Sequence, residues 1–259
     1  MRLPKRLSET AYSRYRKGLI KEVLAGPMPN HIAVIMDGNR RYAKEVLESG
    51  RNEGHRKGEK KIEEMLEWCL DLRVPYITVY AFSKENFKRD KDEVDFIMGL
   101  SEAALYRMAD DKRIHENKVR IKVFGDIPVL PDSVKTAIKY ADERTSSYSD
   151  FSFNVAMAYG SRQEIISAVK NIARKVASHE LDVEEISEET LSEHLYTSDM
   201  PDPDLILRTS GEVRMSNFLL WQMAYSELYF TDVYWPGFRY IDFLRAIRSY
   251  QQRIRRYGE

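Results

Sequence analysis

A short polar turn with two arginines follows an apolar run near the start of the chain. Residues 32–36 are apolar, as in a parallel strand buried on both faces, and the sequence DGNRR comes directly after them. Ligands of open α/β sheets bind beyond the carboxyl ends of strands, where the next helix offers free N–H groups, so we expect Asn39, Arg40 and Arg41 to contact phosphate. Asp37 would repel that phosphate unless a divalent cation such as Mg²⁺ lay between them. The alternative is an ordinary strand-to-helix turn with Asp37 as the N-cap.

Arginine and small polar residues recur just after other predicted strands. They are Arg41 and Arg51 after the first strand, Ser83, Asn86 and Arg89 after the second, and Arg208 and Arg214 after the fifth. The carboxyl ends of parallel strands meet at one edge of a sheet, so these residues together predict a pocket for a polyanion. Taken singly, each arginine is more often a surface ion-pair partner.

Two further features have both a functional and a structural interpretation. In residues 208–230, Arg214 and Ser216 stand beside an apolar stretch that ends before Glu227, an arrangement that suits an amphiphilic ligand. Taken alone, residues 218–225 predict a core helix. His55 is a candidate proton carrier or hydrogen-bond donor to phosphate, and the alternative is a histidine with a purely structural role.

Several familiar site motifs are absent from the sequence. No G-x-G-x-x-G follows the first strand, and there is no P-loop, no zinc-type Cys/His spacing and no G-x-S-x-G elbow. These absences argue against dinucleotide-binding, P-loop, zinc and nucleophile-elbow enzymes.

The pattern of apolar residues predicts one α/β domain around these residues. Strands are expected at 32–36, 77–82, 121–125, 151–159, 205–209 and 227–231, and helices at 8–25, 57–72, 92–117, 132–145 and 161–178. Strands that alternate with longer helices indicate a mostly parallel sheet of about six strands flanked by helices. We interpret the acidic stretch at 181–195 as a solvated face.

Composition limits the class and the compartment of the protein. Lys plus Arg and Asp plus Glu are both 41 in the 259 residues, so we expect no nucleic-acid partner recognised by bulk charge. The single Cys69 excludes an intrachain disulfide, and no apolar segment approaches the ~20 residues of a membrane span. These features favour a cytoplasmic protein with at most peripheral membrane association. The helix at 8–25 is interpreted as a solvated helix across the domain, with a membrane-surface helix as the alternative.

Beyond these patterns, an extended set of motifs resembles the cis-prenyltransferases, which include undecaprenyl and dehydrodolichyl diphosphate synthases. The motifs are HIAVIMDGNRRYA, RNEGHRKG, TVYAFSKENFKR, IKVFGD, NVAMAYGSR, DLILRTSGEVRMSNFLLWQMAYSELYFTDVYWP and the terminal RRYG. They run from about His31 to the end of the chain in the family's order. The resemblance divides the chain into an N-terminal helical extension, residues 1–30, and a catalytic domain, residues 31–259.

The resemblance implies the activity and its residues. Enzymes of this family add isopentenyl diphosphate to an allylic diphosphate with cis geometry and use Mg²⁺. Asp37 would hold Mg²⁺ with Glu227 as the second metal-associated carboxylate, and Ser83 and Asn86 would assist proton removal near the reacting carbons. The substrate-binding residues would be Gly38, Asn39, Arg40, Arg41, Tyr42, Arg51, His55, Phe87, Arg89, Arg208, Arg214, Ser216, Arg256 and Gly258.

The prenyl chain would need an apolar tunnel beside the sheet. The candidate walls are Met65, Leu66, Ile97, Met98 and Leu105, for which ordinary core packing is the alternative. Glu59 stands where the family frequently has a small residue, so product length stays open.

Two sequence details bear on the type of enzyme. Arg40, Tyr42 and Phe87 depart from the bacterial pattern and resemble archaeal and eukaryotic members. Arg256 and Gly258 match the RxG motif, which reaches the partner's isopentenyl diphosphate site and implies a homodimer.

The resulting hypothesis is a Mg²⁺-dependent, homodimeric cis-prenyltransferase. It would make a polyprenyl diphosphate that is the precursor of a glycosyl carrier, and this apolar product would bring the enzyme into contact with the membrane surface. Two alternatives stay open: a prenyltransferase of the same fold with a different acceptor, and a non-catalytic subunit of a heteromeric enzyme.

Overall fold

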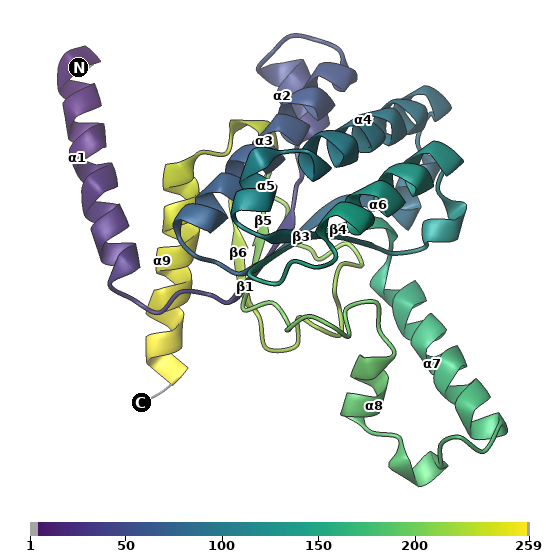
Figure 1. Cartoon of the computed structure of the whole chain (residues 1–259). Coiled ribbons are helices and arrows are strands. Elements are labelled where there is room, and N and C mark those ends of the chain that lie inside the picture. Colours follow the sequence, from purple (N-terminus) through teal and green to yellow (C-terminus); the bar gives the residue numbers. More distant parts are fainter. Residues whose placement is uncertain (1–4, 258–259) are drawn as a thin grey trace.

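A six-stranded sheet whose neighbouring strands are all parallel lies at the centre of the protein (Figure 1). The computed structural model describes residues 5–257, and the side chains of 13–253. The strands are β1 (His31–Ile35), β2 (Tyr76–Ser83), β3 (Val119–Phe124), β4 (Phe151–Tyr159), β5 (Leu205–Arg208) and β6 (Glu227–Phe230). Their order across the sheet is β3-β4-β2-β1-β5-β6.

The central position of β1 determines where a ligand can bind. Strands β2, β4 and β3 lie on one side of β1, and β5 and β6 lie on the other. The chain therefore changes direction across the sheet at β1, and the carboxyl ends of β1 and β5 border the crevice that open α/β sheets use for ligands. All residues of β1 and β5 are buried, which explains the apolar runs at 32–35 and 205–207.

The helices are α1 (Lys5–Leu24), α2 (Asn39–Glu45), α3 (Arg51–Asp71), α4 (Lys91–Ala109), α5 (Lys112–Glu116), α6 (Asp132–Thr145), α7 (Ser161–Ala177), α8 (Glu188–Glu193) and α9 (Tyr240–Tyr257). Four short 3₁₀ turns accompany them within the described chain: η1 (Lys84–Lys88), η2 (Ile127–Val129), η3 (Val183–Glu185) and η4 (Trp235–Gly237).

The two faces of the sheet are covered differently. Ile32 and Val34 of β1 point to the face on which α3, α4, α6 and α9 form the main core, and Leu19 of α1 is buried in the same core. Ala33 and Ile35 point to the other face, where Phe218 and Leu219 of an irregular segment cover them. In Figure 1, α7 and α8 extend away from the sheet, and α1 lies beside α9.

The structure confirms most predicted elements and corrects three. The helix expected at 57–72 begins earlier, as α3 at Arg51. The helix expected at 92–117 is two helices, because the Asp111 side chain accepts a hydrogen bond from the Arg113 N–H and starts α5 anew. The helix that residues 218–225 would form alone is absent, because this segment is a series of turns with Leu219 in a left-handed conformation.

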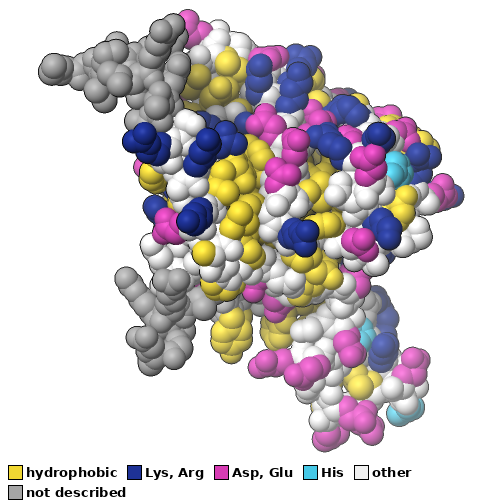
Figure 2. Space-filling model, turned by 60° about the vertical axis from the view of Figure 1, so that its left-hand side comes forward, with side chains coloured by type: hydrophobic (Ala, Val, Ile, Leu, Met, Phe, Trp, Pro, Cys, Tyr) yellow, Lys and Arg dark blue, Asp and Glu magenta, His cyan; other side chains and the backbone are white. Residues whose placement is uncertain are grey.

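Surface and core features bear on the remaining expectations. Cys69 is a buried core thiol, and burial raises its pKa. Basic and acidic side chains are interspersed around a hydrophobic band on the face shown in Figure 2. Within residues 5–257, we find no helix with the length and apolar character needed to cross a membrane.

Candidate active site

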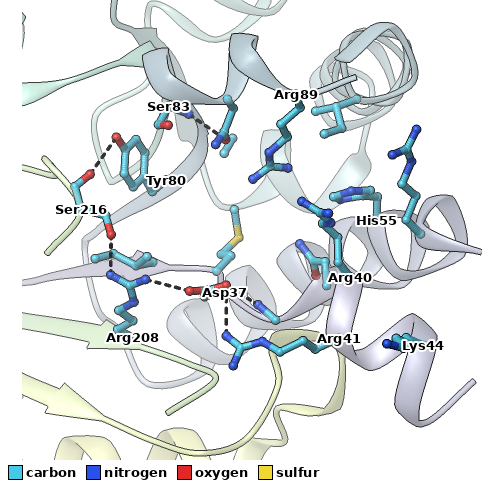
Figure 3. A pocket seen from close by; sticks show the side chains of 18 of the residues that line it. Asp37, Arg40, Arg41, Lys44, His55, Tyr80, Ser83, Arg89, Arg208 and Ser216 are labelled. Atoms are coloured by element: carbon cyan, nitrogen blue, oxygen red, sulfur yellow. Dashed lines mark hydrogen bonds and ion pairs between the residues drawn. The ribbon is translucent and has the colours of Figure 1, made fainter. Parts of the chain in front are cut away.

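A cleft of about 700 Å³ opens where the carboxyl ends of β1, β2 and β5 meet (Figure 3). Its volume lies in the range of about 300–1,000 Å³ that is usual for small-molecule sites. The lining residues are Ile35, Met36, Asp37, Gly38, Asn39, Arg40, Arg41, Lys44, Ser49, Arg51, His55, Tyr80, Ala81, Ser83, Asn86, Arg89, Ile97, Arg208, Arg214 and Ser216.

Hydrogen bonds between the Asp37 backbone and the Thr209 side chain hold Asp37 at the centre of the cleft. Its N–H donates to the Thr209 hydroxyl over 2.9 Å, and the same hydroxyl donates to the Asp37 carbonyl oxygen over 2.7 Å. Gly38 follows with φ 101°, and a Cβ at this position would meet Ser210 and Tyr234 at 2.8 Å. Only glycine fits this tight turn, which directs the Asp37 carboxylate into the cleft.

Arg208 connects Asp37 to the opposite wall of the cleft. Its guanidinium donates to Asp37 Oδ2 and to Ser216 Oγ, each over 2.7 Å. Arg208 is only 3% exposed, and its Nε is buried without a partner among the described residues.

A second ionic cluster surrounds Glu93 in the first turn of α4. The carboxylate is 1% exposed, and Arg89 Nη1 lies 3.0 Å from it. Arg51 and Arg40 lie 3.4 and 4.0 Å away, and His55 Nε2 lies 3.1 Å away. Glu93 therefore orients Arg89 and His55 before any substrate binds, whereas Arg51 also bonds Asp90 and Arg40 lies at the margin of the cluster.

The protonation states of this cluster follow from its surroundings. Burial lowers the pKa of His55, and the hydrogen bond to Glu93 offsets this only in part. Burial by itself would raise the pKa of Glu93, but the His55 hydrogen bond and the charges of Arg89 and Arg40 lower it overall. We therefore expect a neutral imidazole that donates from Nε2 to an ionised Glu93 near neutral pH.

Two glycines of α3 allow α2 to approach it closely. A Cβ on Gly54 would collide with the Asn39 carbonyl oxygen, and a Cβ on Gly58 would collide with the Asn39 side chain. Asn39 Oδ1 is buried here and has no partner among the described atoms. The motif RNEGHRKG thus places α2 and its arginines against α3.

The end of β2 supplies a further wall. The Ser83 N–H donates to Asn86 Oδ1 over 3.2 Å, so η1 begins with a reciprocal cap. The pairing of β2 with β4 is irregular between Tyr80 and Phe82. Such irregularities redirect side chains, and Tyr80 and Ala81 both line the cleft.

The side chains that line the cleft are mostly basic. They include seven arginine and lysine side chains and a single carboxylate, Asp37. Neighbouring carboxylates of Glu93, Asp90 and Glu212 form ion pairs with five of these arginines. The helix α2 has only seven residues, so its dipole is small and the side chains carry most of the positive charge. This arrangement can hold a polyanion such as a diphosphate, since arginine binds phosphate oxygens through two parallel bonds.

An apolar cavity of about 100 Å³ adjoins the polar cleft. It lies between α3, α4 and the strands β2 and β4. The two spaces share the lining residues Met36, Asn39, His55, Ala81 and Ile97. A ligand with a polar head and an apolar tail could therefore occupy both.

The predicted walls of this cavity are partly right. Ile97 and Leu105 line it, whereas Met65, Leu66 and Met98 are packed in the core outside it. The prediction missed the strand contribution of Val79, Phe153, Val155 and Met157, because only the register of the sheet shows which face these residues occupy. Glu59 also lines the cavity and forms an ion pair with Arg107.

Most predicted site residues line the cleft. They are Asp37, Gly38, Asn39, Arg40, Arg41, Arg51, His55, Ser83, Asn86, Arg89, Arg208, Arg214 and Ser216. Tyr42 does not, because its ring lies against Gly237 of η4. Phe87 does not, because its ring packs edge-on against Phe82 with 4.9 Å between centroids. The Arg256 side chain and Gly258 lie outside the described part of the chain.

Within a single chain Glu227 lies far from Asp37, and its role as a second metal-associated carboxylate stays a prediction. Glu227 begins β6 and pairs with Leu205, which in turn pairs with Ile32 at the amino end of β1. Asp37 lies five residues beyond Ile32, so the two carboxylates are roughly 15 Å apart along the strands. Glu227 instead forms an ion pair with Arg253 over 2.8 Å.

Some residues of the site had no sequence signal that singled them out. Glu93 looks like any acidic residue in the first turn of a helix, and Thr209 looks like the end of an apolar strand. Lys44 could have been found, since it follows Arg40 and Arg41 at helical spacing on α2.

The donor set fits a metal ion only if the metal is shared with a substrate. Asp37 is the one carboxylate in the cleft lining, and the described side chains, those of residues 13–253, include no group of three or more His, Cys, Asp or Glu that could hold a metal. Mg²⁺ is usually bound through one or two carboxylates and substrate phosphates. Asp37, which is partly exposed beside seven cations that attract phosphate, meets this requirement.

The sequence is similar to a described family and to named relatives. The prenyltransferase family model described as undecaprenyl diphosphate synthase matches residues 35–258. A tritrans,polycis-undecaprenyl-diphosphate synthase (geranylgeranyl-diphosphate specific) of Pyrococcus horikoshii is 53% identical over 256 residues, 99% of this chain and 97% of the relative. The protein of the same name in Thermoplasma volcanium is 49% identical over 98% of each chain.

Solved structures give the same result. Lavandulyl diphosphate synthase from Lavandula x intermedia, in complex with dimethylallyl diphosphate, superposes with a TM-score of 0.82 at 34% identity, covering 89% of this chain and 96% of that one. A probable undecaprenyl diphosphate synthase from Campylobacter jejuni superposes with a TM-score of 0.71 at 34% identity, covering 90% and 100%.

Proposed function

Because the chain belongs to the undecaprenyl diphosphate synthase family of cis-prenyltransferases, we propose that it condenses isopentenyl diphosphate with an allylic diphosphate in the cleft around Asp37 and Arg208. Residues 31–259 would form the catalytic domain. The product is a polycis-prenyl diphosphate, as in the relatives that share about half of the sequence.

The main support for the proposal is that a polar cleft and an apolar cavity adjoin each other. The cleft with seven basic side chains opens onto an apolar cavity between α3, α4 and the sheet. An allylic diphosphate has the matching shape, since its charged head suits the first space and its hydrocarbon tail suits the second.

The first chemical step requires stabilisation of charge. The C–O bond of the allylic diphosphate breaks, both electrons leave with the diphosphate, and an allylic cation remains. Arg51, Arg89 and Arg41 would bind the departing oxygens and stabilise the transition state more than the ground state. Asp37 would hold Mg²⁺ together with diphosphate oxygens, and the ion, when bound, supplies further positive charge to the leaving group.

The second substrate would bind on the other side of Asp37. Arg208, Arg214 and Ser216 would hold the diphosphate of isopentenyl diphosphate, whose double bond donates the electron pair for the new C–C bond. A proton then passes from the adduct to an oxygen of the released diphosphate, and the C–H electron pair forms the new double bond. Ser83 and Asn86, fixed to each other at the end of β2, would orient the reacting groups for this step.

The choice of primer and the length of the product are proposed by similarity to the relatives. Their names specify geranylgeranyl diphosphate and an undecaprenyl product, and we propose the same pair for this chain. We propose that the product chain extends from the cleft into the apolar cavity between α3 and α4 as it grows.

Assembly and location complete the proposal. The RxG residues Arg256 and Gly258 support a homodimer, which light scattering of the purified protein would test. A long apolar product supports peripheral membrane contact, as acyl chains bind bilayers in proportion to their length.

The test is incubation of the purified chain with Mg²⁺, labelled isopentenyl diphosphate and allylic primers of increasing length, followed by separation of products by chain length. We expect the most efficient extension from geranylgeranyl diphosphate. Transfer only to hydroxyl-bearing acceptors would overturn the condensation, and activity only after addition of a second protein would indicate a subunit of a heteromeric enzyme.

A further inference from the structure

The segment that carries Arg214 and Ser216 has an unusual backbone. Ser216, Asn217 and Leu219 have φ angles of 49°, 63° and 45°, in the left-handed region. This region is unfavourable for residues with a Cβ, and asparagine tolerates it best. Contacts from outside the segment must therefore hold it in this shape.

The first turn of α7 provides these contacts. The Ser161 N–H donates to the Asn217 carbonyl oxygen over 2.8 Å, and the Arg162 N–H donates to Asn217 Oδ1 over 2.9 Å. Ser161 Oγ accepts from the Leu220 N–H over 2.9 Å. The N-cap position of α7 is Gly160, which has no side chain to accept a hydrogen bond. Asn217 thus caps a helix that begins 56 positions before it in the sequence.

The same side chain also reaches the opposite wall of the cleft. Asn217 Nδ2 donates to Gln163 Oε1 over 3.1 Å and to Glu85 Oε1 over 3.3 Å. Glu85 lies in η1, directly before Asn86, and Asn86 lines the cleft as Ser216 does. Asn217 itself does not line the cleft. Asn217 therefore connects the two walls of the cleft without being part of the cleft lining.

The fit around Asn217 is close. A Cβ on Gly160 would lie 2.6 Å from Asn217 Nδ2, and it would also collide with the Gln163 side chain. The glycine at the N-cap of α7 is thus required for the approach of the Asn217 amide.

We propose that Asn217 is a positioning residue for the second substrate: it fixes the Arg214–Ser216 segment to α7 and η1 and so sets the separation of the two cleft walls. This inference rests on the proposed function, because that function assigns Arg214 and Ser216 to isopentenyl diphosphate. It predicts that loss of the Asn217 amide impairs isopentenyl diphosphate more than the allylic primer.

Two variants separate the parts played by the amide. Asn217→Gly keeps the left-handed backbone at no steric cost and removes only the side chain. Asn217→Asp keeps an acceptor for the Arg162 N–H but replaces the donor toward Glu85 with a repelling oxygen. Asn171→Ala, at an exposed position of the same helix, is the matched control.

The experiment measures KM for each substrate, kcat, and amide exchange in the first turn of α7. For Asn217→Gly we expect the KM for isopentenyl diphosphate to rise about tenfold, because the variant loses a hydrogen bond and leaves the other group without a partner. We expect the KM for the allylic primer to stay within twofold of wild type. The Arg162 amide, which loses its acceptor, should exchange faster in this variant. In Asn217→Asp this amide should stay protected while the KM for isopentenyl diphosphate still rises.

Two results would overturn the inference. One is an unchanged KM for isopentenyl diphosphate in both Asn217 variants, and the other is an equal rise for both substrates, which a general loss of structure would give. If the wild-type chain itself lacks activity, the proposed function fails, whereas amide exchange still reports whether Asn217 caps α7.

Discussion

Replacing Arg208 by lysine keeps the positive charge between the two proposed substrate sites and removes the hydrogen-bond geometry of the guanidinium. The variant therefore tests which of the two matters. Arg208 bonds Asp37 Oδ2 and Ser216 Oγ at once, each over 2.7 Å, from a position that is almost fully buried. Lysine keeps the charge but has a single ammonium group on a flexible stem, so it cannot reproduce the planar fork.

The magnitude follows from the bonds that are lost. A hydrogen bond to a charged group contributes roughly 1.5–3 kcal/mol. Arg208 also donates to the Arg214 carbonyl oxygen, and we expect Arg208→Lys to lose either the bond to Asp37 or the bond to Ser216. A loss of about 2 kcal/mol corresponds to a decrease of about thirtyfold in kcat/KM for isopentenyl diphosphate. The assay is incorporation of labelled isopentenyl diphosphate at limiting concentration with saturating geranylgeranyl diphosphate and Mg²⁺.

Arg253→Lys is the matched control. Arg253 also bonds a carboxylate, Glu227, over 2.8 Å, but it lies at the opposite end of the strands and is about half exposed. Exposed ion pairs contribute little, so we expect activity within twofold of wild type. A variant Arg208→Lys that keeps kcat/KM within threefold of wild type would refute the argument that the fork connects the two walls.

Three further predictions concern other parts of the structure. Glu93→Gln removes the charge that orients Arg89 and its neighbours, so we expect a raised KM for the allylic primer alone and a loss of roughly 1–3 kcal/mol of unfolding free energy in urea. Burial lowers the pKa of His31 to about 4 from about 6.5, so the unfolded chain binds more protons between these values and stability falls as the pH drops below 6.5. Between pH 7 and 5 this loss is about 2 kcal/mol, and urea unfolding of His31→Gln should show a pH dependence weaker by that amount. Glu59→Ala removes a side chain that lines the apolar cavity and pairs with Arg107, so chromatography should show longer products, and an unchanged length distribution would contradict this role.

The strands and the first site turn could be predicted because their signals are local. A continuous apolar run followed by a glycine turn indicates a buried parallel strand and its carboxyl end, and residues 32–41 meet both conditions. The order of strands places Arg208 beside Asp37, as the predicted convergence at one sheet edge requires.

The errors have a common cause in long-range packing. Residues 218–225 have the composition of a core helix, but bonds from α7, a distant part of the chain, hold this region in turns instead. The distance of Glu227 from Asp37 likewise depends on long-range packing, because the register of β6 places Glu227 at the far end of the strands. The buried position of Glu93 depends on the packing of α4 against α3, which no local pattern specifies.

The most direct test of the central claim compares the wild-type chain with Asp37→Asn. Both are incubated with Mg²⁺, labelled isopentenyl diphosphate and geranylgeranyl diphosphate, and the extracted products are analysed for length and double-bond geometry. We expect elongated products with new cis double bonds from the wild type and a loss of extension in folded Asp37→Asn. Trans products or no products from the folded wild type, or undiminished turnover by Asp37→Asn, would contradict this claim.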